Sequence, residues 1–129
     1  MGTHCRTIIC DNKTPLISMY CQFDGYLSGH GVDLARFLLD MKIVTGLGLG
    51  LECEQVANGA GCLAAQMIAY FKNAPGNIYI EPIPDEETDH VDYVYKVQVD
   101  SGKITVEVTG DGNNFKGTVS EFANYCKEQ

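Results

Sequence analysis

The alternation of apolar and polar residues predicts strands in two parts of the chain. Residues 5–11 and 16–23 are rich in Ile, Thr, Tyr and Met, and the Asn-Lys-Thr-Pro segment 12–15 between them is typical of a turn. In residues 91–99 every second residue is Val or Tyr, and residues 103–109 repeat the alternation after an Asp-Ser-Gly turn. We therefore expect two β-hairpins, with a further short strand at residues 77–82.

Three other segments are predicted to be helical. A helix is expected at residues 32–44, where apolar residues recur every three or four positions: Leu34, Phe37, Leu38 and Met41. A second is expected at residues 61–72, and a capping box at Thr118 and Glu121 opens a last helix after a loop at residues 110–117. The resulting order, ββααβββα, describes an α+β fold with a mainly antiparallel sheet and helices packed on one face.

The composition fits a single domain of residues 1–129, since 45% hydrophobic residues supply one core. No apolar run approaches the ~20 residues of a membrane-spanning helix, so no membrane partner is expected. The first residues, Met-Gly-Thr-His-Cys-Arg, lack the apolar stretch of a secretory signal. We therefore expect a cytoplasmic location.

The formal charge of −8 argues against a general nucleic-acid binder, which needs a basic surface to displace counterions. This charge does not exclude one small anionic ligand, because backbone N–H groups and a single arginine can hold an anion in an acidic protein. The six cysteines lie mostly in apolar segments, which favours free buried thiols. Neither a Cys-x-x-Cys pair nor a His-x-x-x-His spacing occurs, so we expect no metal site and no other cofactor.

Residues 21–31, between a predicted strand and a predicted helix, combine polar residues with glycines. Gly25, Gly29 and Gly31 permit close approach of the backbone, and the helix that follows exposes unpaired N–H groups. The side chains that a ligand would meet there are Tyr20, Gln22, Asp24, Tyr26, Ser28 and His30. For each residue alone, a turn or a core position is the alternative, whereas the cluster as a whole indicates a binding site.

A second glycine-containing segment, with Asn58, Gly59 and Gly61, precedes the second helix, in which Gln66 could add amide recognition. The first helix would be about 20 Å long, and the connector of residues 45–57 could span about 40 Å when extended. Both helix N-termini can then meet at one edge and bind a phosphate or carboxylate. A short turn would instead make the two helices antiparallel.

Catalysis is the alternative to binding. Asp24 and His30 can form an acid–base pair if their side chains meet, which would suit a nucleotide hydrolase or phosphodiesterase. Cys62, at the start of the second helix, could act as a nucleophile with His30, although a small core residue explains it equally well. Binding without turnover is the favoured hypothesis.

Several motifs resemble those of a family of small, uncharacterised bacterial and phage proteins. In that family the pattern reads approximately GTR-x-x-T, YRQ-[FY]-DGYPSGHG, NG-x-GCLAAQ and G-x-IY. The matching parts of this chain are residues 2–7, 20–31, 58–66 and 76–79. The resemblance covers most of the chain, and it implies no established reaction.

This chain departs from the family pattern at three positions. His4 and Cys21 stand where arginines are expected, and Leu27 stands where proline is expected. If the arginines hold an anion in relatives, the binding mode here must differ, with Arg6 as the only nearby replacement.

In general character, small acidic phage proteins with polar pockets are similar to the sponges that sequester nucleotide immune signals, often as homo-oligomers. This similarity implies a protein that holds a nucleotide-like, phosphate-containing ligand at the two helix entrances, in the host bacterial cytoplasm if a phage encodes it. The alternatives are a hydrolase of the same ligand and an acidic module that inhibits a host enzyme through a surface such as residues 85–89. Whether the chain forms a homo-oligomer stays open.

Overall fold

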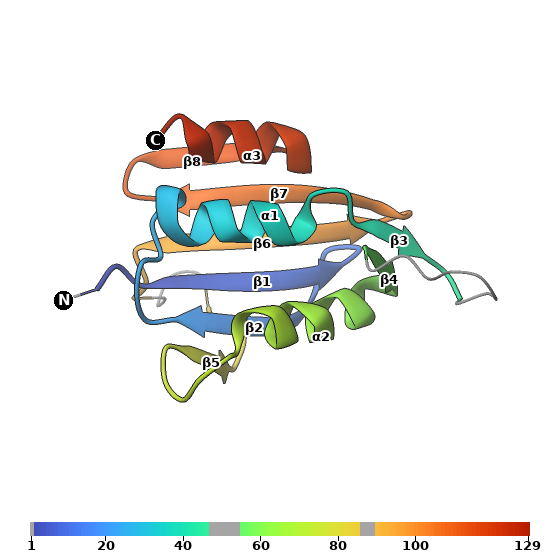
Figure 1. Ribbon diagram of the computed structural model, residues 1–129, viewed down its shortest axis with the longest axis horizontal. Helices are drawn as coiled ribbons and strands as arrows, with labels where there is room; N and C mark the ends of the chain where they lie inside the picture. The colour runs from blue at the N-terminus through green and yellow to red at the C-terminus, as the bar shows by residue number, and fades with distance from the viewer. Residues whose placement is uncertain (1, 47–54, 86–89) are drawn as a thin grey trace.

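A six-stranded, mainly antiparallel sheet forms the centre of the fold, and helices cover one of its faces (Figure 1). The computed structural model describes residues 2–46, 55–85 and 90–129. The strands follow one another across the sheet in the order β5 (Ile78–Glu81), β2 (Thr14–Cys21), β1 (Cys5–Asp11), β6 (Tyr93–Asp100), β7 (Lys103–Gly110) and β8 (Asn113–Thr118). The pair β1–β6 is parallel and the other pairs are antiparallel, so the sheet is mixed. The predicted α+β class with a mainly antiparallel sheet is confirmed.

Both predicted hairpins are present. β1 and β2 pair from Cys5 opposite Cys21 to Asp11 opposite Thr14, and β6 and β7 pair across the turn at residues 101–102. The alternation in β6 follows from its position, because one face of the strand lies under the helices and its side chains are buried there: Tyr93, Tyr95, Val97 and Val99.

The segment predicted as a loop, residues 110–117, contains a further strand. Gly110, Asp111 and Gly112 have φ values of 137°, 47° and 80°, and they turn the chain back so that β8 pairs with β7. β8 lies at the edge of the sheet, and its residues alternate between half-buried and exposed. Because few of its residues are apolar, the strand left little hydrophobic signal, and the loop prediction is wrong.

The first helix is shorter than predicted. α1 (Val32–Leu38) ends because Leu39 takes an extended conformation and Asp40 has a φ of 63°. Residues 42–44, predicted as helix, form β3 (Lys42–Val44), which pairs in parallel with β4 (Val56–Asn58). The order ββααβββα is therefore wrong, because it lacks β3, β4 and β8.

The remaining helices are α2 (Gly59–Phe71) and α3 (Val119–Lys127). The predicted capping box of α3 is confirmed: the Thr118 N–H donates to Glu121 Oε1 (2.8 Å), and the Glu121 N–H donates to Thr118 Oγ1 (3.2 Å). Among the described helices, none has the length and apolar character needed to cross a membrane.

The starts of α1 and α2 do not meet. Pairing of β3 with β4 sets Asn58 beside Val44, at the end of the molecule where α1 finishes. α2 then runs back, and Phe71 at its end packs against His30, just before α1 begins, with 4.9 Å between the ring centroids (Figure 1). The helices are antiparallel, so the expectation that both N-termini share one phosphate-binding edge is wrong.

Candidate functional site

A hollow of about 460 Å³ lies between the segment after β2, the start of α1 and the end of α2. Small-molecule sites in proteins have volumes of this order. Cys21 and His30 line the hollow and are each only 4% exposed, so they form its inner wall. The rest of the lining consists mainly of aromatic rings, carboxylates and amides: Phe23, Asp24, Tyr26, Asp33, Tyr70, Phe71, Asn73 and Asn77.

A π-helical turn (Leu27–Gly31) carries His30 into the interior. The His30 N–H donates to the Asp24 carbonyl (2.8 Å), and Asp24 itself has a φ of 57°. A Cβ atom on Gly29 would lie 2.5 Å from the same carbonyl oxygen, so this position requires glycine. Single π-helical turns are frequent at functional sites, where they re-aim a side chain, and here the turn directs an imidazole at the sheet.

His30 meets two cysteines and a threonine of the sheet. Cys5 and Cys21 are directly opposite each other in the β1–β2 hairpin, and the His30 ring lies above them. The two sulfur atoms and a His30 ring nitrogen all lie within 4.8 Å of one another, and all three residues are buried. Thr7 Oγ1 forms a 2.8 Å hydrogen bond with His30 Nε2, and Tyr95 contacts the ring edge-on at 5.1 Å between centroids.

The pKa values of the two cysteine thiols are shifted in opposite directions. A hydrogen bond from the Cys5 thiol and the neighbouring His30 imidazole lower the pKa of Cys21 to about 5, and burial opposes this shift. Cys21 Sγ also donates a hydrogen bond to the Phe23 carbonyl (3.0 Å). Burial raises the pKa of Cys5 well above its ordinary value. Of the two thiols, Cys21 therefore gives up its proton more readily than Cys5, and it is the one that lines the hollow.

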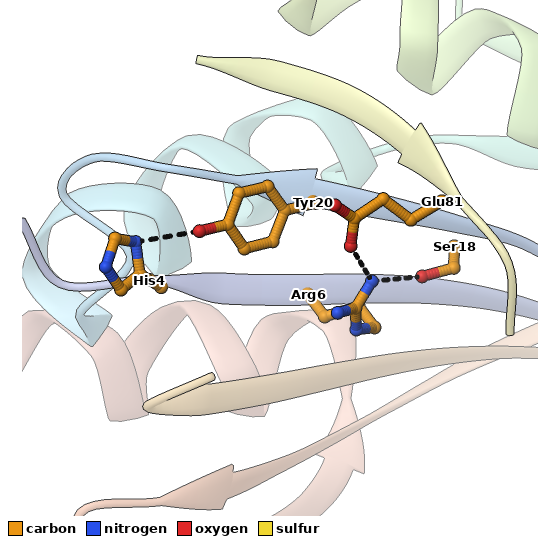
Figure 2. Close-up of polar contacts among 5 residues, drawn as sticks. All are labelled: His4, Arg6, Ser18, Tyr20 and Glu81. Carbon is orange, nitrogen blue, oxygen red and sulfur yellow. Dashed lines mark hydrogen bonds and ion pairs between the residues drawn. The ribbon is translucent and has the colours of Figure 1, made fainter. Parts of the chain in front are cut away.

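Arg6 and Tyr20, two of the predicted ligand-binding residues, lie on the opposite face of the sheet, away from the helices (Figure 2). Arg6 Nη1 donates to Glu81 Oε1 (2.8 Å) and to Ser18 Oγ (3.0 Å), and its guanidinium lies 5.7 Å from the centre of the Tyr20 ring. The Tyr20 hydroxyl forms a 3.0 Å hydrogen bond with His4 Nδ1. Neither residue reaches the hollow, because adjacent residues of a strand point to opposite faces.

The predicted residues of α2 are also separated from the hollow. Asn58 Oδ1 accepts a hydrogen bond from the Gly46 N–H (2.6 Å), which links the last residue of β4 to the segment just after β3. Gln66 Nε2 donates to the Val56 carbonyl (3.1 Å), and Gln66 Oε1 accepts from the Cys62 thiol (3.3 Å). Gly59 and Gly61 start the helix at this same distant end.

Some of the remaining predicted residues line the hollow, and others serve close packing of the backbone. Asp24, Tyr26, Gly29 and His30 line the hollow. A Cβ atom on Gly25 would lie 2.7 Å from Cys5 Cβ, and one on Gly31 would lie 2.9 Å from Cys126 Sγ, so both glycines serve close packing. Ser28 is exposed and Gln22 is half-buried, and neither belongs to the described lining.

The Cys5–Cys21–His30 cluster was not predicted from the sequence. The hairpin itself was predicted, but the turn that pairs Asp11 with Thr14 would by itself set position 5 opposite position 20. A register shift between Ile9 and Cys10 brings Cys5 opposite Cys21, and the sequence did not predict this shift. The contribution of His30 depends on the π-helical turn, for which the sequence carries no comparable pattern. Asn77 was missed as well; its Oδ1 accepts from the Phe23 N–H (3.0 Å) and lies 3.7 Å from Cys21 Sγ.

Comparison of the chain with protein-family models, with curated proteins and with solved structures found no match in any of the three. Hypotheses about function therefore depend on the residues of the hollow.

Proposed function

We propose that the protein binds a small, planar, nucleoside-like molecule in the hollow beside His30. The observation that carries this proposal is the gathering of exposed aromatic rings around one depression. Phe23, Tyr26 and Tyr70 line it and are 50%, 39% and 50% exposed. Rings left in water at a concave site offer stacking surfaces, and stacking of a base on such a ring contributes about 1–3 kcal/mol to binding.

The polar lining favours a ligand rich in hydrogen-bond donors. Asp24 and Asp33 supply carboxylates, which accept hydrogen bonds from amino and ring N–H groups, and Asn73 and Asn77 supply amides. Neither lysine nor arginine occurs among the described lining residues, and two carboxylates repel a phosphate. The heterocycle of a nucleotide-like ligand would enter the hollow, and any phosphate would point to solvent.

Binding is favoured over hydrolysis by the contacts of the proposed acid and base. The His30 ring is engaged by Thr7, whereas the Asp24 carboxylate lies 3.5 Å from the Tyr26 hydroxyl. A hydrolase that uses His30 and Asp24 needs the two side chains within hydrogen-bonding distance. Sequestration of a nucleotide-like signal is accordingly the biological role that we propose, and residues 86–89 of the alternative acidic interaction surface lie outside the described residues.

The test is calorimetric titration with adenosine, guanosine, cytidine, uridine and their 5′-monophosphates. We expect the three nucleosides that carry an exocyclic amine to bind more tightly than uridine, and no monophosphate to bind more tightly than its nucleoside. Tyr26→Leu should weaken binding by roughly 5-fold or more, from the stacking energy. Tyr79→Leu is the matched control, because Tyr79 is 45% exposed but packs beside Tyr20 on the other sheet face.

Two results would contradict the proposal. One is that none of the four nucleosides binds, and the other is that Tyr26→Leu and Tyr79→Leu change affinity equally. Chromatography of ADP-ribose and cyclic dinucleotides after incubation with the protein separates binding from cleavage, since a binding protein returns both unchanged.

A further inference from the structure

The inner wall of the hollow contains the ligand types of a soft-metal site. Two sulfur atoms and one imidazole nitrogen converge from three segments: Cys5 on β1, Cys21 on β2 and His30 in the π-helical turn. Their exposed fractions are 0%, 4% and 4%. The three atoms lie within 4.8 Å of one another, whereas ligands of a tetrahedral zinc ion lie roughly 3.5 Å apart, as bond lengths of about 2.0–2.3 Å require. A movement of about 1 Å would therefore close the site.

The charges of these groups match a divalent ion. Two thiolates and a neutral imidazole carry a formal charge that Zn²⁺ cancels, so the complex as a whole is neutral. Burial of ionised groups is costly unless they are paired or coordinate a metal, and a neutral complex avoids that cost. Thiolate and imidazole are also the ligands that zinc prefers over hard cations such as Mg²⁺ or Ca²⁺.

The surroundings of His30 resemble the outer shell of a metal ligand. A metal-bound histidine typically uses its second ring nitrogen to hydrogen-bond a neighbouring group, which fixes the orientation of the ring. Thr7 Oγ1 forms a 2.8 Å hydrogen bond with Nε2, which leaves Nδ1 as the nitrogen for a metal, and the rings of Phe71 and Tyr95 flank the imidazole. His30 is thus held in one orientation, as a ligand needs to be.

We propose that Cys5, Cys21 and His30 bind one Zn²⁺ ion, with its fourth position open to the hollow. Cys21 and His30 both line the hollow, so water or a donor atom of a bound molecule can reach that position. Three protein ligands with one open position are typical of zinc ions that act on a ligand, whereas purely structural sites have four. The proposal is independent of the nucleoside hypothesis, because it depends on the three ligand atoms alone.

The experiment uses the 129-residue chain, reduced, stripped with a chelator and then titrated with Zn²⁺ or Co²⁺. We expect one ion per chain, and for Co²⁺ a thiolate-to-metal charge-transfer band with the intense visible bands of tetrahedral coordination. Cys5→Ser, Cys21→Ser and His30→Gln should each lower the affinity by roughly 100-fold or more, since loss of an outer-shell partner alone costs about 10–100-fold. Cys10→Ser is the matched control, being an equally buried thiol on β1 that is 2% exposed.

A second measurement does not depend on the folding of the variants. In the wild-type protein, Zn²⁺ should slow alkylation of Cys5 and Cys21 at least 10-fold, while leaving the rates at Cys10 and Cys62 unchanged, as mapped by mass spectrometry. The proposal is overturned if Zn²⁺ protects no cysteine, if it protects Cys10 or Cys62 equally, or if the reduced protein takes Cu⁺ but not Zn²⁺. A stable Cys5–Cys21 disulfide in protein purified without reductant, resistant to reduction under native conditions, would also overturn it.

Discussion

Substitution of Tyr95 by phenylalanine tests how the sheet holds the segment that forms the hollow. Tyr95 on β6 is fully buried, and its hydroxyl donates a 2.7 Å hydrogen bond to the Gly25 carbonyl, 70 residues away along the chain. Burial raises the pKa of Tyr95 above its ordinary value, so the hydroxyl keeps its proton and remains a donor at any working pH. Tyr95→Phe removes this one oxygen and preserves the ring contact with His30.

The expected loss of stability follows from the Gly25 carbonyl, which loses its hydrogen-bond donor in the variant. Gly25 is buried, and removal of a donor from a buried acceptor costs about 1–3 kcal/mol. For a chain of this size, 1 kcal/mol lowers the melting temperature by roughly 3–5 °C. We therefore expect Tyr95→Phe to lower the free energy of unfolding by about 1–3 kcal/mol and to weaken nucleoside binding, because Gly25 adjoins both Asp24 and Tyr26.

Urea denaturation followed by circular dichroism measures the change, with Tyr93→Phe as the control. Tyr93 lies two positions earlier on the same strand, and its hydroxyl makes a longer bond, 3.3 Å, to the exposed Asp111. Its loss should cost less than about 0.5 kcal/mol, as for a surface change. Equal midpoints for the two variants would refute the reasoning, because the Tyr95 hydroxyl would then contribute nothing specific to the segment.

Three further outcomes are expected. Thr7→Val should lower zinc affinity by about 10–100-fold while Thr7→Ser retains it, measured by chelator competition, because serine keeps the hydroxyl that hydrogen-bonds His30 Nε2 and valine does not. Gly29→Ala should destabilise the π-helical turn and abolish ligand binding in calorimetry, because the added Cβ would lie 2.5 Å from the Asp24 carbonyl oxygen; a folded variant with unchanged affinity would contradict this. Burial raises the pKa of Cys126 from 9.0 to about 12, so the unfolded chain loses this proton first and stability should fall as pH rises from 9 to 12. The free energy of unfolding, measured by urea denaturation at pH 8 and pH 10, should fall by up to about 1 kcal/mol less in Cys126→Ser than in the wild type; parallel changes would exclude this thiol as the cause.

The elements that the sequence predicted well are those whose signal is local. The β6–β7 hairpin has strict alternation and a Ser-Gly turn, and the α3 capping box needs only residues 118 and 121. β3 and β4 are three residues each and pair with each other rather than with the main sheet, so each is too short to leave a pattern of its own. That pairing also decides the direction of α2, and it therefore decides which end of α2 meets His30.

Arg6 lies outside the hollow because of a single alternation along β1. Cys5 and Thr7 point to the helix-covered face, and Arg6 between them points to the other, where Glu81 neutralises it. The hairpin turn and the register shift between Ile9 and Cys10 together set this pairing. A shift by one more residue would exchange the faces, bringing a guanidinium to His30 in place of a thiol and a hydroxyl. The local sequence around His30 identifies a site, but the register of the strand beneath it determines whether that site offers a positive charge or a pair of sulfur ligands. The same register explains why one buried face can hold a neutral metal complex while the polar network of the other face stays separate from it.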